Sequence, residues 1–201
     1  MKKFVFELQR FTETITLTEG DDRYIISYGN SDKILYGLGG SDEIWVSADS
    51  VTVDCGAGDD EVWNSIGTGI SIYGGDGDDV ISPNIDATVR GGAGNDEIWQ
   101  TFPAVIQFAS GDGNDTVSYT LLGQSTLQVD SDYYTLASGV DTMIYVGEGS
   151  VLFKGTDVGG LENYGVVIVG GNQISPPNSE TENTSNTPEE NNNVYTYSNG
   201  N

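Results

Sequence analysis

Histidine is absent from the 201-residue chain, and cysteine occurs once, as Cys55. The lack of histidine excludes imidazole metal sites and both Ser-His-Asp and Cys-His catalysis. A single cysteine cannot form an intramolecular disulfide. Cys55 stands at a turn position where glycine is usual, so we interpret it as a small residue tolerated there, not as a redox centre or a nucleophile.

Basic residues are also scarce. The chain has 7 Lys and Arg against 31 Asp and Glu, a formal net charge of −24. Such a charge repels nucleic acids and anionic membranes, so we expect neither as a partner. The acidic residues either solvate a disordered chain or bind cations. The 36% hydrophobic content and the 11 tyrosines, in alternating runs, favour an ordered, cation-binding chain.

Long apolar runs are missing as well. No stretch approaches the roughly 18 apolar residues needed to span a bilayer, so we expect no transmembrane segment. The N-terminus has a basic start, but Glu7, Gln9 and Arg10 interrupt its apolar stretch and leave it too short for a secretory signal. If the protein is exported, we expect export without a cleaved N-terminal signal.

What the chain does contain is a glycine-aspartate phrase that recurs five times. The third and fourth copies fit G-G-x-G-x-D-x-U-x at every fixed position, where U is a large apolar residue. The closing aspartates are spaced 18, 19, 17 and 19 residues apart. A fixed period of this kind is the signature of a solenoid. The copies span 37–45, 55–63, 74–82, 91–99 and 110–118, and they close on Asp42, Asp60, Asp79, Asp96 and Asp115.

Each period also contains two short strands, one directly after the aspartate and one before the next glycine turn. In the second set, apolar residues of one parity alternate with polar ones such as Thr52, Ser71 and Thr88. Stacked about 4.8 Å apart, such strands form a flattened coil with the apolar set inside. The predicted fold is therefore all-β, a right-handed parallel β-roll or β-solenoid. The connections opposite the glycine turns share no acidic position, so the repeated carboxylates should follow one edge only.

The whole chain divides into four predicted segments. Residues 1–19 alternate apolar and polar and should form one or two capping strands. Residues 20–125 form the roll, with degenerate half-turns at 20–46. Residues 126–172 lose the repeat and should form an antiparallel β cap at the C-terminal end. Residues 173–201, rich in Asn, Ser, Thr and Glu, should be a disordered linker or tail.

The residues of the repeated motif are suited to binding a metal ion through oxygen atoms. Glycines at its first, second and fourth positions permit left-handed turns that direct carbonyls to one side. The aspartate at the sixth position brings a carboxylate over the same concavity. Two stacked turns thus offer an all-oxygen shell, which suits Ca²⁺ better than Mg²⁺ or a transition metal.

The copies at 74–82 and 91–99 resemble the nonapeptide of the haemolysin-type calcium-binding family, also called RTX or repeats-in-toxin. The resemblance covers about residues 20–120. It implies a calcium-binding β-roll that bacteria export in one step. In that family glycine motifs follow each other every nine residues on both edges; here every second motif is replaced, which implies up to four Ca²⁺ ions on one edge. The implied metal residues are Asp42, Asp60, Asp79, Asp96 and Asp115, with carbonyls from turns that contain Gly56, Gly58, Gly74, Gly75, Gly77, Gly91, Gly92, Gly94, Gly111 and Gly113.

We therefore expect a secreted, extracellular calcium-binding module of structural or adhesive function that is not an enzyme. The alternative is a non-catalytic accessory domain of a larger secreted hydrolase or toxin. A metal-free solenoid is disfavoured, because turns alone do not require aspartate in all five copies. Trp45, Trp63 and Trp99 share the ninth position and should point outward. They either pack against each other, which we favour, or bind sugar rings of a cell-surface glycan.

Overall fold

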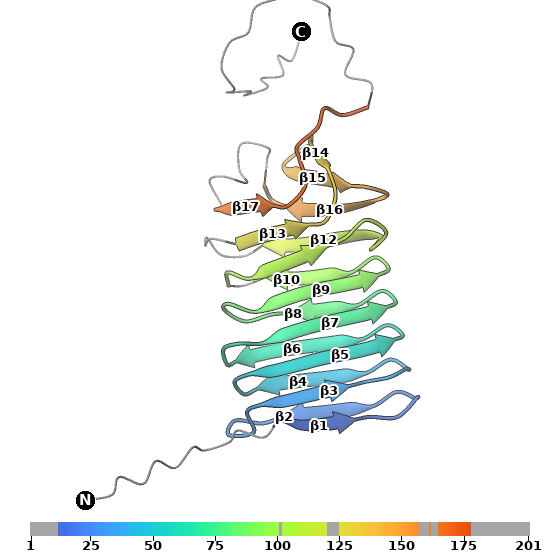
Figure 1. The fold of residues 1–201 in the computed structure, drawn as a ribbon, viewed down its shortest axis with the longest axis vertical. Helices are drawn as coiled ribbons and strands as arrows, with labels where there is room; N and C mark the ends of the chain where they lie inside the picture. The colour runs from blue at the N-terminus through green and yellow to red at the C-terminus, as the bar shows by residue number, and fades with distance from the viewer. Residues whose placement is uncertain (1–11, 101, 120–124, 157–160, 162–164, 178–201) are drawn as a thin grey trace, which may run out of the picture.

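The computed structural model describes residues 12–100, 102–119, 125–156, 161 and 165–177. Its strands wind into a stack of flat turns, with one sheet on each side (Figure 1). Within each sheet of the stack, neighbouring strands pair in parallel, and their register advances by one turn of the chain at each step. This is the predicted all-β, right-handed parallel solenoid, and the predicted fold class is confirmed.

Two sheets alternate along the chain. The first has the order β1-β3-β5-β7-β9-β11-β13-β17, and the second the order β14-β15-β16-β12-β10-β8-β6-β4-β2. The first sheet contains β1 (Glu13–Thr16), β3 (Lys33–Tyr36), β5 (Val51–Ala57), β7 (Ser71–Asp76), β9 (Thr88–Ala93), β11 (Val105–Phe108), β13 (Ser125–Val129) and β17 (Val166–Val169). The second contains β2 (Arg23–Ile26), β4 (Glu43–Ser47), β6 (Glu61–Ile66), β8 (Val80–Ser82), β10 (Glu97–Gln100), β12 (Asn114–Tyr119), β14 (Tyr133–Ser138), β15 (Asp141–Val146) and β16 (Gly149–Lys154).

The core lies between the two sheets, because alternate side chains of each strand point inward. Parallel in-register pairing places equivalent apolar residues directly above one another. The first sheet contributes a column of Leu35, Val53, Ile72, Val89, Ile106 and Leu127, all at most 1% exposed. The second contributes Ile44, Val62, Ile81, Ile98 and Val117, which are the eighth-position residues of the repeat and are fully buried.

The N-terminal part of the stack differs from the expected half-turns. Strand β1 pairs in parallel with β3, and β2 with β4, each with an offset of 20 residues. Residues 13–47 therefore form full turns in the same register as the later ones, and the half-turn interpretation is wrong. The part of the predicted capping segment at residues 1–11 lies outside the described residues.

The C-terminal end combines two kinds of pairing. Strands β14, β15 and β16 form an antiparallel meander, and β16 lies parallel to β12 at the end of the second sheet. Strands β13 and β17, which also lie in the predicted cap, extend the first sheet in parallel. Of the predicted tail, Gln173 and Ile174 contact Tyr133 through a β-bridge and a backbone hydrogen bond, and 178–201 lie outside the described residues.

The edge opposite the glycine turns is closed by buried amides. The Asn64 side chain donates to the carbonyls of Val46 and Ile66 and accepts a hydrogen bond from the backbone N–H of Asn84. Asn84 in turn donates to the carbonyl of Ser65. The buried polar side chains of this edge are neutral amides, and the Asp49 carboxylate that accepts from the N–H of Thr68 is exposed, so the asymmetry expected from the sequence is present. Within the described residues, we find no helix of the length and apolarity required to cross a membrane.

Candidate metal centre

The five closing aspartates form one buried column at the glycine-turn edge. Each is at most 3% exposed, although an ionised carboxylate is rarely buried without a partner. In each case Oδ1 accepts a hydrogen bond from the backbone N–H of the aspartate one turn earlier, at 2.6–3.1 Å. The column therefore runs without a break from Asp22, which donates to Asp42, through to Asp115. We call Asp42, Asp60, Asp79, Asp96 and Asp115 the carboxylate row.

The second oxygen of four of these carboxylates makes no hydrogen bond among the described residues. Oδ2 of Asp42, Asp60, Asp79 and Asp96 is buried and has no hydrogen-bond partner among the described residues. A buried acceptor without a partner costs about 1–3 kcal/mol, and more when it carries charge. Four such oxygens in successive turns are a repeated feature, not an isolated fault. A cation along the row would give these oxygens a partner.

The glycine turns stack so closely that side chains do not fit at two of their positions. At the second position, a Cβ built on Gly75 or Gly92 would lie 1.9 or 2.1 Å from the carbonyl oxygen of the preceding turn. At the fourth position, the same holds at 2.0–2.2 Å for Gly58, Gly77 and Gly94. These five glycines also have positive φ angles, which disfavour residues with a Cβ. Gly56 at the second position and Gly113 at the fourth position behave in the same way.

At the first position, the carboxylate of the same turn occupies the space that a side chain would need. A Cβ built on Gly74 would lie 2.1 Å from Oδ2 of Asp79 and 2.5 Å from the carbonyl oxygen of Gly91. On Gly91 it would lie 1.9 Å from Oδ2 of Asp96, and on Gly37 it would lie 2.5 Å from Oδ2 of Asp42. We call this space the cradle of a turn. In each of these three turns it is lined by the orphaned carboxylate oxygen of the same turn.

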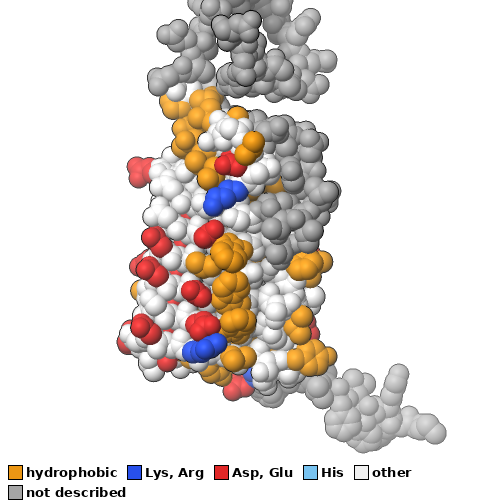
Figure 2. Space-filling view, turned by 180° about the vertical axis from the view of Figure 1, so that it is seen from behind, with side chains coloured by type: hydrophobic (Ala, Val, Ile, Leu, Met, Phe, Trp, Pro, Cys, Tyr) orange, Lys and Arg blue, Asp and Glu red, His pale blue; other side chains and the backbone are white. Residues whose placement is uncertain are grey.

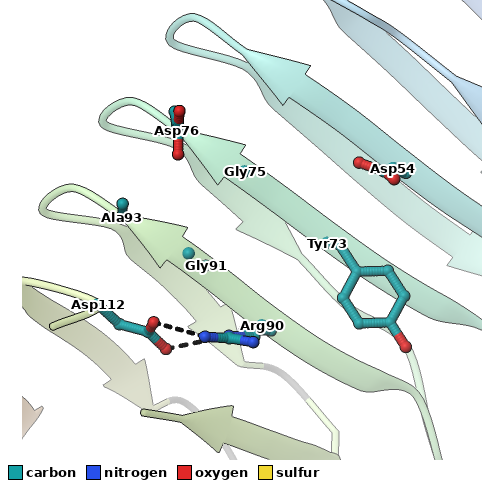
Figure 3. Close-up of a pocket in the computed structure, with 9 residues that line it drawn as sticks. Asp54, Tyr73, Gly75, Asp76, Arg90, Gly91, Ala93 and Asp112 are labelled. Atoms are coloured by element: carbon teal, nitrogen blue, oxygen red, sulfur yellow. Dashed lines mark hydrogen bonds and ion pairs between the residues drawn. The ribbon is translucent and has the colours of Figure 1, made fainter. Parts of the chain in front are cut away.

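The fifth turn departs from the others. Gly94 bridges to Gly113, whereas Phe108 occupies the register of the earlier first-position glycines, so this turn is two residues longer. Gly111 has open space around it and does not stack on the fourth turn. The side chains of Arg90 and Asp112 point toward each other and hold the longer turn on β9 (Figure 3). Their two hydrogen bonds measure 2.7 and 3.1 Å.

The register also shows two copies of the phrase that sequence reasoning missed. Residues 17–25 lie directly below the copy at 37–45, with Gly20 and Asp22 in the fourth and sixth places. Asp22 differs from the row, since its Oδ2 accepts hydrogen bonds from the N–H and the hydroxyl of Thr18. Residues 146–154 lie above the fifth copy, and Val151 pairs with Asp115 and ends the row. The spacing of Gly147 and Gly149 was the only sequence signal for this copy.

Burial dominates the electrostatics of the row. It raises the pKa of Asp60 to about 6 and that of Asp79 to about 8, against the hydrogen bond that each accepts from the preceding turn. Burial likewise raises the pKa of Asp42, Asp96 and Asp115, and the neighbouring carboxylates add to the effect. A row of buried like charges without a cation thus favours the protonated form.

The donors fit a hard cation. They are carboxylate and carbonyl oxygens only, which Ca²⁺ accepts in irregular arrangements of 6–8 ligands. No three His, Cys, Asp or Glu side chains converge on one point in the part of the chain that the structure describes. An ion here would therefore take most of its ligands from backbone carbonyls. The carboxylates of adjacent turns would supply the charge.

The three tryptophans lie on the outer face of the second sheet, as predicted. Ile25, Trp45 and Trp63 stand one above another in the register of β2, β4 and β6. A vertical hydrophobic stripe beside acidic side chains is visible on one face of the molecule (Figure 2). Trp45 and Trp63 stack with ring centroids 6.0 Å apart, and Trp63 meets Trp99 edge to face at 5.6 Å. The indoles thus pack against each other, with Trp45 37% and Trp99 42% exposed. Binding of a glycan stays a prediction.

Comparison with known proteins adds a distant structural similarity. No protein-family model matches the chain, and no curated protein matches it in sequence. The crystal structure of the extracellular lipase LipA from Serratia marcescens is similar, with a TM-score of 0.36 and 13% sequence identity. The match covers 80% of this chain and 41% of the lipase chain, so it spans well under half of the lipase.

Proposed function

We propose that the carboxylate row binds calcium ions and that this binding stabilises the roll. The observation that carries the proposal is the set of four buried, unpartnered Oδ2 atoms of Asp42, Asp60, Asp79 and Asp96. A divalent cation between the turns would give each of these oxygens a partner. It would also offset the charge that burial otherwise disfavours. The ligands would be these carboxylates with carbonyls of the glycine turns.

The size of the repulsion between neighbouring carboxylates supports coupling between calcium binding and folding. Two unit charges one strand spacing apart, about 4.8 Å, repel by roughly 3–4 kcal/mol at an effective dielectric constant of about 20. The five ionised members of the row make four such neighbouring pairs. A typical domain is stable by only about 5–15 kcal/mol. Without the ion, the repulsion is therefore large enough to prevent the fully ionised roll from forming.

The proposal describes a non-catalytic structural or adhesive module that works outside the cell. Oxygen-only sites in extracellular modules bind Ca²⁺ in the range of about 10⁻⁴–10⁻³ M, and we expect a similar affinity here. Export by the bacterial one-step route rests on the sequence resemblance alone. An accessory role beside a catalytic domain in a longer chain is the alternative, and it uses the same calcium sites.

Circular dichroism and differential scanning calorimetry test the proposal, first in chelator and then in millimolar calcium. We expect calcium to increase the β signal and to raise the melting temperature. Magnesium at the same concentration should have little effect, because it prefers a rigid octahedron with retained water. An unchanged melting temperature on addition of calcium would contradict the proposal.

A further inference from the structure

The first position of the repeat is not occupied by glycine in every turn. Backbone pairing places Leu17, Gly37, Cys55, Gly74, Gly91 and Phe108 above one another. In three of these turns the residue is glycine and the carboxylate oxygen occupies the cradle, and we call such a cradle open. In the other three, a side chain starts from the point where an open cradle holds the carboxylate oxygen.

Cys55 is the informative case, because the rest of its turn is intact. Gly56 and Gly58 have the positive φ angles of the other copies, and Oδ1 of Asp60 still accepts the N–H of Asp42 at 2.6 Å. The Cys55 side chain is fully buried and lies on the same face of β5 as Val53, so it points into the roll. The aspartate ladder is therefore continuous through this turn, while its cradle holds a thiol.

Leu17 and Phe108 mark the two ends of the row. Leu17 packs against the core below Gly37. Phe108 is 2% exposed, and its ring reaches the turn above, since a Cβ on Gly149 would lie 2.8 Å from its Cζ. These two residues close the ends of the row with apolar groups. Cys55 is thus the one substituted first position that lies between open cradles.

We propose that Cys55 limits the number of calcium ions in the row to three, held in the turns of Gly37, Gly74 and Gly91. This inference rests on the proposed calcium function and adds its stoichiometry and the residue that sets it. Asp60 then faces no ion in its own turn, and its buried Oδ2 takes an ion of a turn beside it as its partner. The ion in the turn of Gly37 is separated by one turn from the adjacent pair at Gly74 and Gly91.

The test is the number of calcium ions per chain at saturation, from equilibrium dialysis with the metal counted. We expect three for the wild type and four for Cys55→Gly, which opens the fourth cradle. Cys55→Ala is the matched control, since it removes the sulfur but keeps the Cβ, and it should still bind three. Gly74→Ala should bind two.

Each outcome of the count has one meaning. Four ions in the wild type, or an equal number in the wild type and in a folded Cys55→Gly protein, would overturn the role of Cys55 while leaving the calcium function intact. No bound calcium in the wild type would overturn both proposals. Circular dichroism in calcium establishes that the variants fold, and the wild-type count decides the question if Cys55→Gly does not.

Discussion

At the scale of single residues, the sixth-position aspartate performs two tasks with its two oxygens. Oδ1 is a structural acceptor that ties each turn to the one before it. In four of the five aspartates Oδ2 is buried and unpartnered, and in our proposal it is the oxygen that binds the ion. The fifth-position residue next to it has only the first property: the Asp78 side chain is exposed, and its Oδ1 accepts the N–H of Asn95 in the following turn. Adjacent carboxylates thus have different roles in the same turn.

Asp79→Asn should separate these two tasks. The amide oxygen can still accept the N–H of Asp60, but the charge is lost. We expect the variant to be less stable than the wild type in saturating calcium and more stable in chelator, by about 1–3 kcal/mol in each case. Asp78→Asn is the control and should change neither value appreciably. Urea unfolding in calcium and the folded fraction by circular dichroism in chelator measure the effect, and a shift of the same sign in both would contradict the assignment.

Gly92 and Gly111 should respond differently to the same substitution. Gly92→Ala combines a positive φ with a contact of 2.1 Å to the Gly75 carbonyl, whereas Gly111→Ala has a positive φ and open space. Left-handed backbone costs a residue with a Cβ about 1–2 kcal/mol, and the clash adds about 1–3 kcal/mol. Urea unfolding in saturating calcium should therefore show the larger loss for Gly92→Ala. Equal losses would mean that the turns do not stack as described.

At the scale of elements, the two edges of the roll satisfy their buried polar groups in different ways. Both must satisfy polar groups where the chain turns between sheets. The glycine-turn edge uses carboxylates, which in our proposal a cation neutralises. The opposite edge uses the amides of Asn64 and Asn84 and requires none. The two edges should therefore respond differently to pH and to mutation.

The calcium-free roll should be most stable in acid. The pKa of Asp60 is raised to about 6 and that of Asp79 to about 8 in the folded state, so the folded state binds more protons than the unfolded state above about pH 4. Their contribution is fully present below about pH 4 and is lost as the pH rises through 6 and 8. Circular dichroism in chelator from pH 4 to 9 should follow this loss. In calcium, acidification should instead weaken binding, because protons compete with the ion. A calcium-free roll that gains stability from pH 4 to 8 would contradict the prediction.

The amide edge should affect stability without affecting the ions. Asn64→Ala removes three hydrogen bonds, of which those to Val46 and Asn84 are buried and that to Ile66 is partly buried. We expect a loss of about 2–3 kcal/mol in saturating calcium and an unchanged number of bound ions. The control is Ser65→Ala, since that hydroxyl is exposed and bonds only to Ser47 among the described residues. A change in ion count would show that the edges are coupled.

At the scale of the whole molecule, the net charge of −24 divides into an exposed part and a buried part. Exposed carboxylates are screened by salt, with a Debye length of about 10 Å at 0.1 M and about 3 Å at 1 M. The row is buried and excluded from the ion atmosphere, so screening should act on it weakly. Specific binding, not ionic strength, should therefore control whether the roll forms.

Salt and calcium should then have separable effects. In chelator, about 1 M sodium chloride should leave the protein largely unfolded at neutral pH, whereas millimolar calcium should fold it at low ionic strength. Fluorescence of Trp45, Trp63 and Trp99 provides a suitable signal, since their ring contacts require stacked turns. Full folding by sodium chloride alone would mean that general screening of charge is sufficient.

The sequence alone determined the period, the core positions and the carboxylate row, because each depends on local rules that repeat. Glycine at fixed places sets the turns, and alternation sets which face is buried. Only the tertiary structure decided which residues stand above one another. The copies at 17–25 and 146–154, the longer fifth turn and the place of Cys55 all depend on register. Register depends on how the length and the hydrophobic pattern of each turn match those of the turns beside it, and this match is a relation between residues far apart in the sequence.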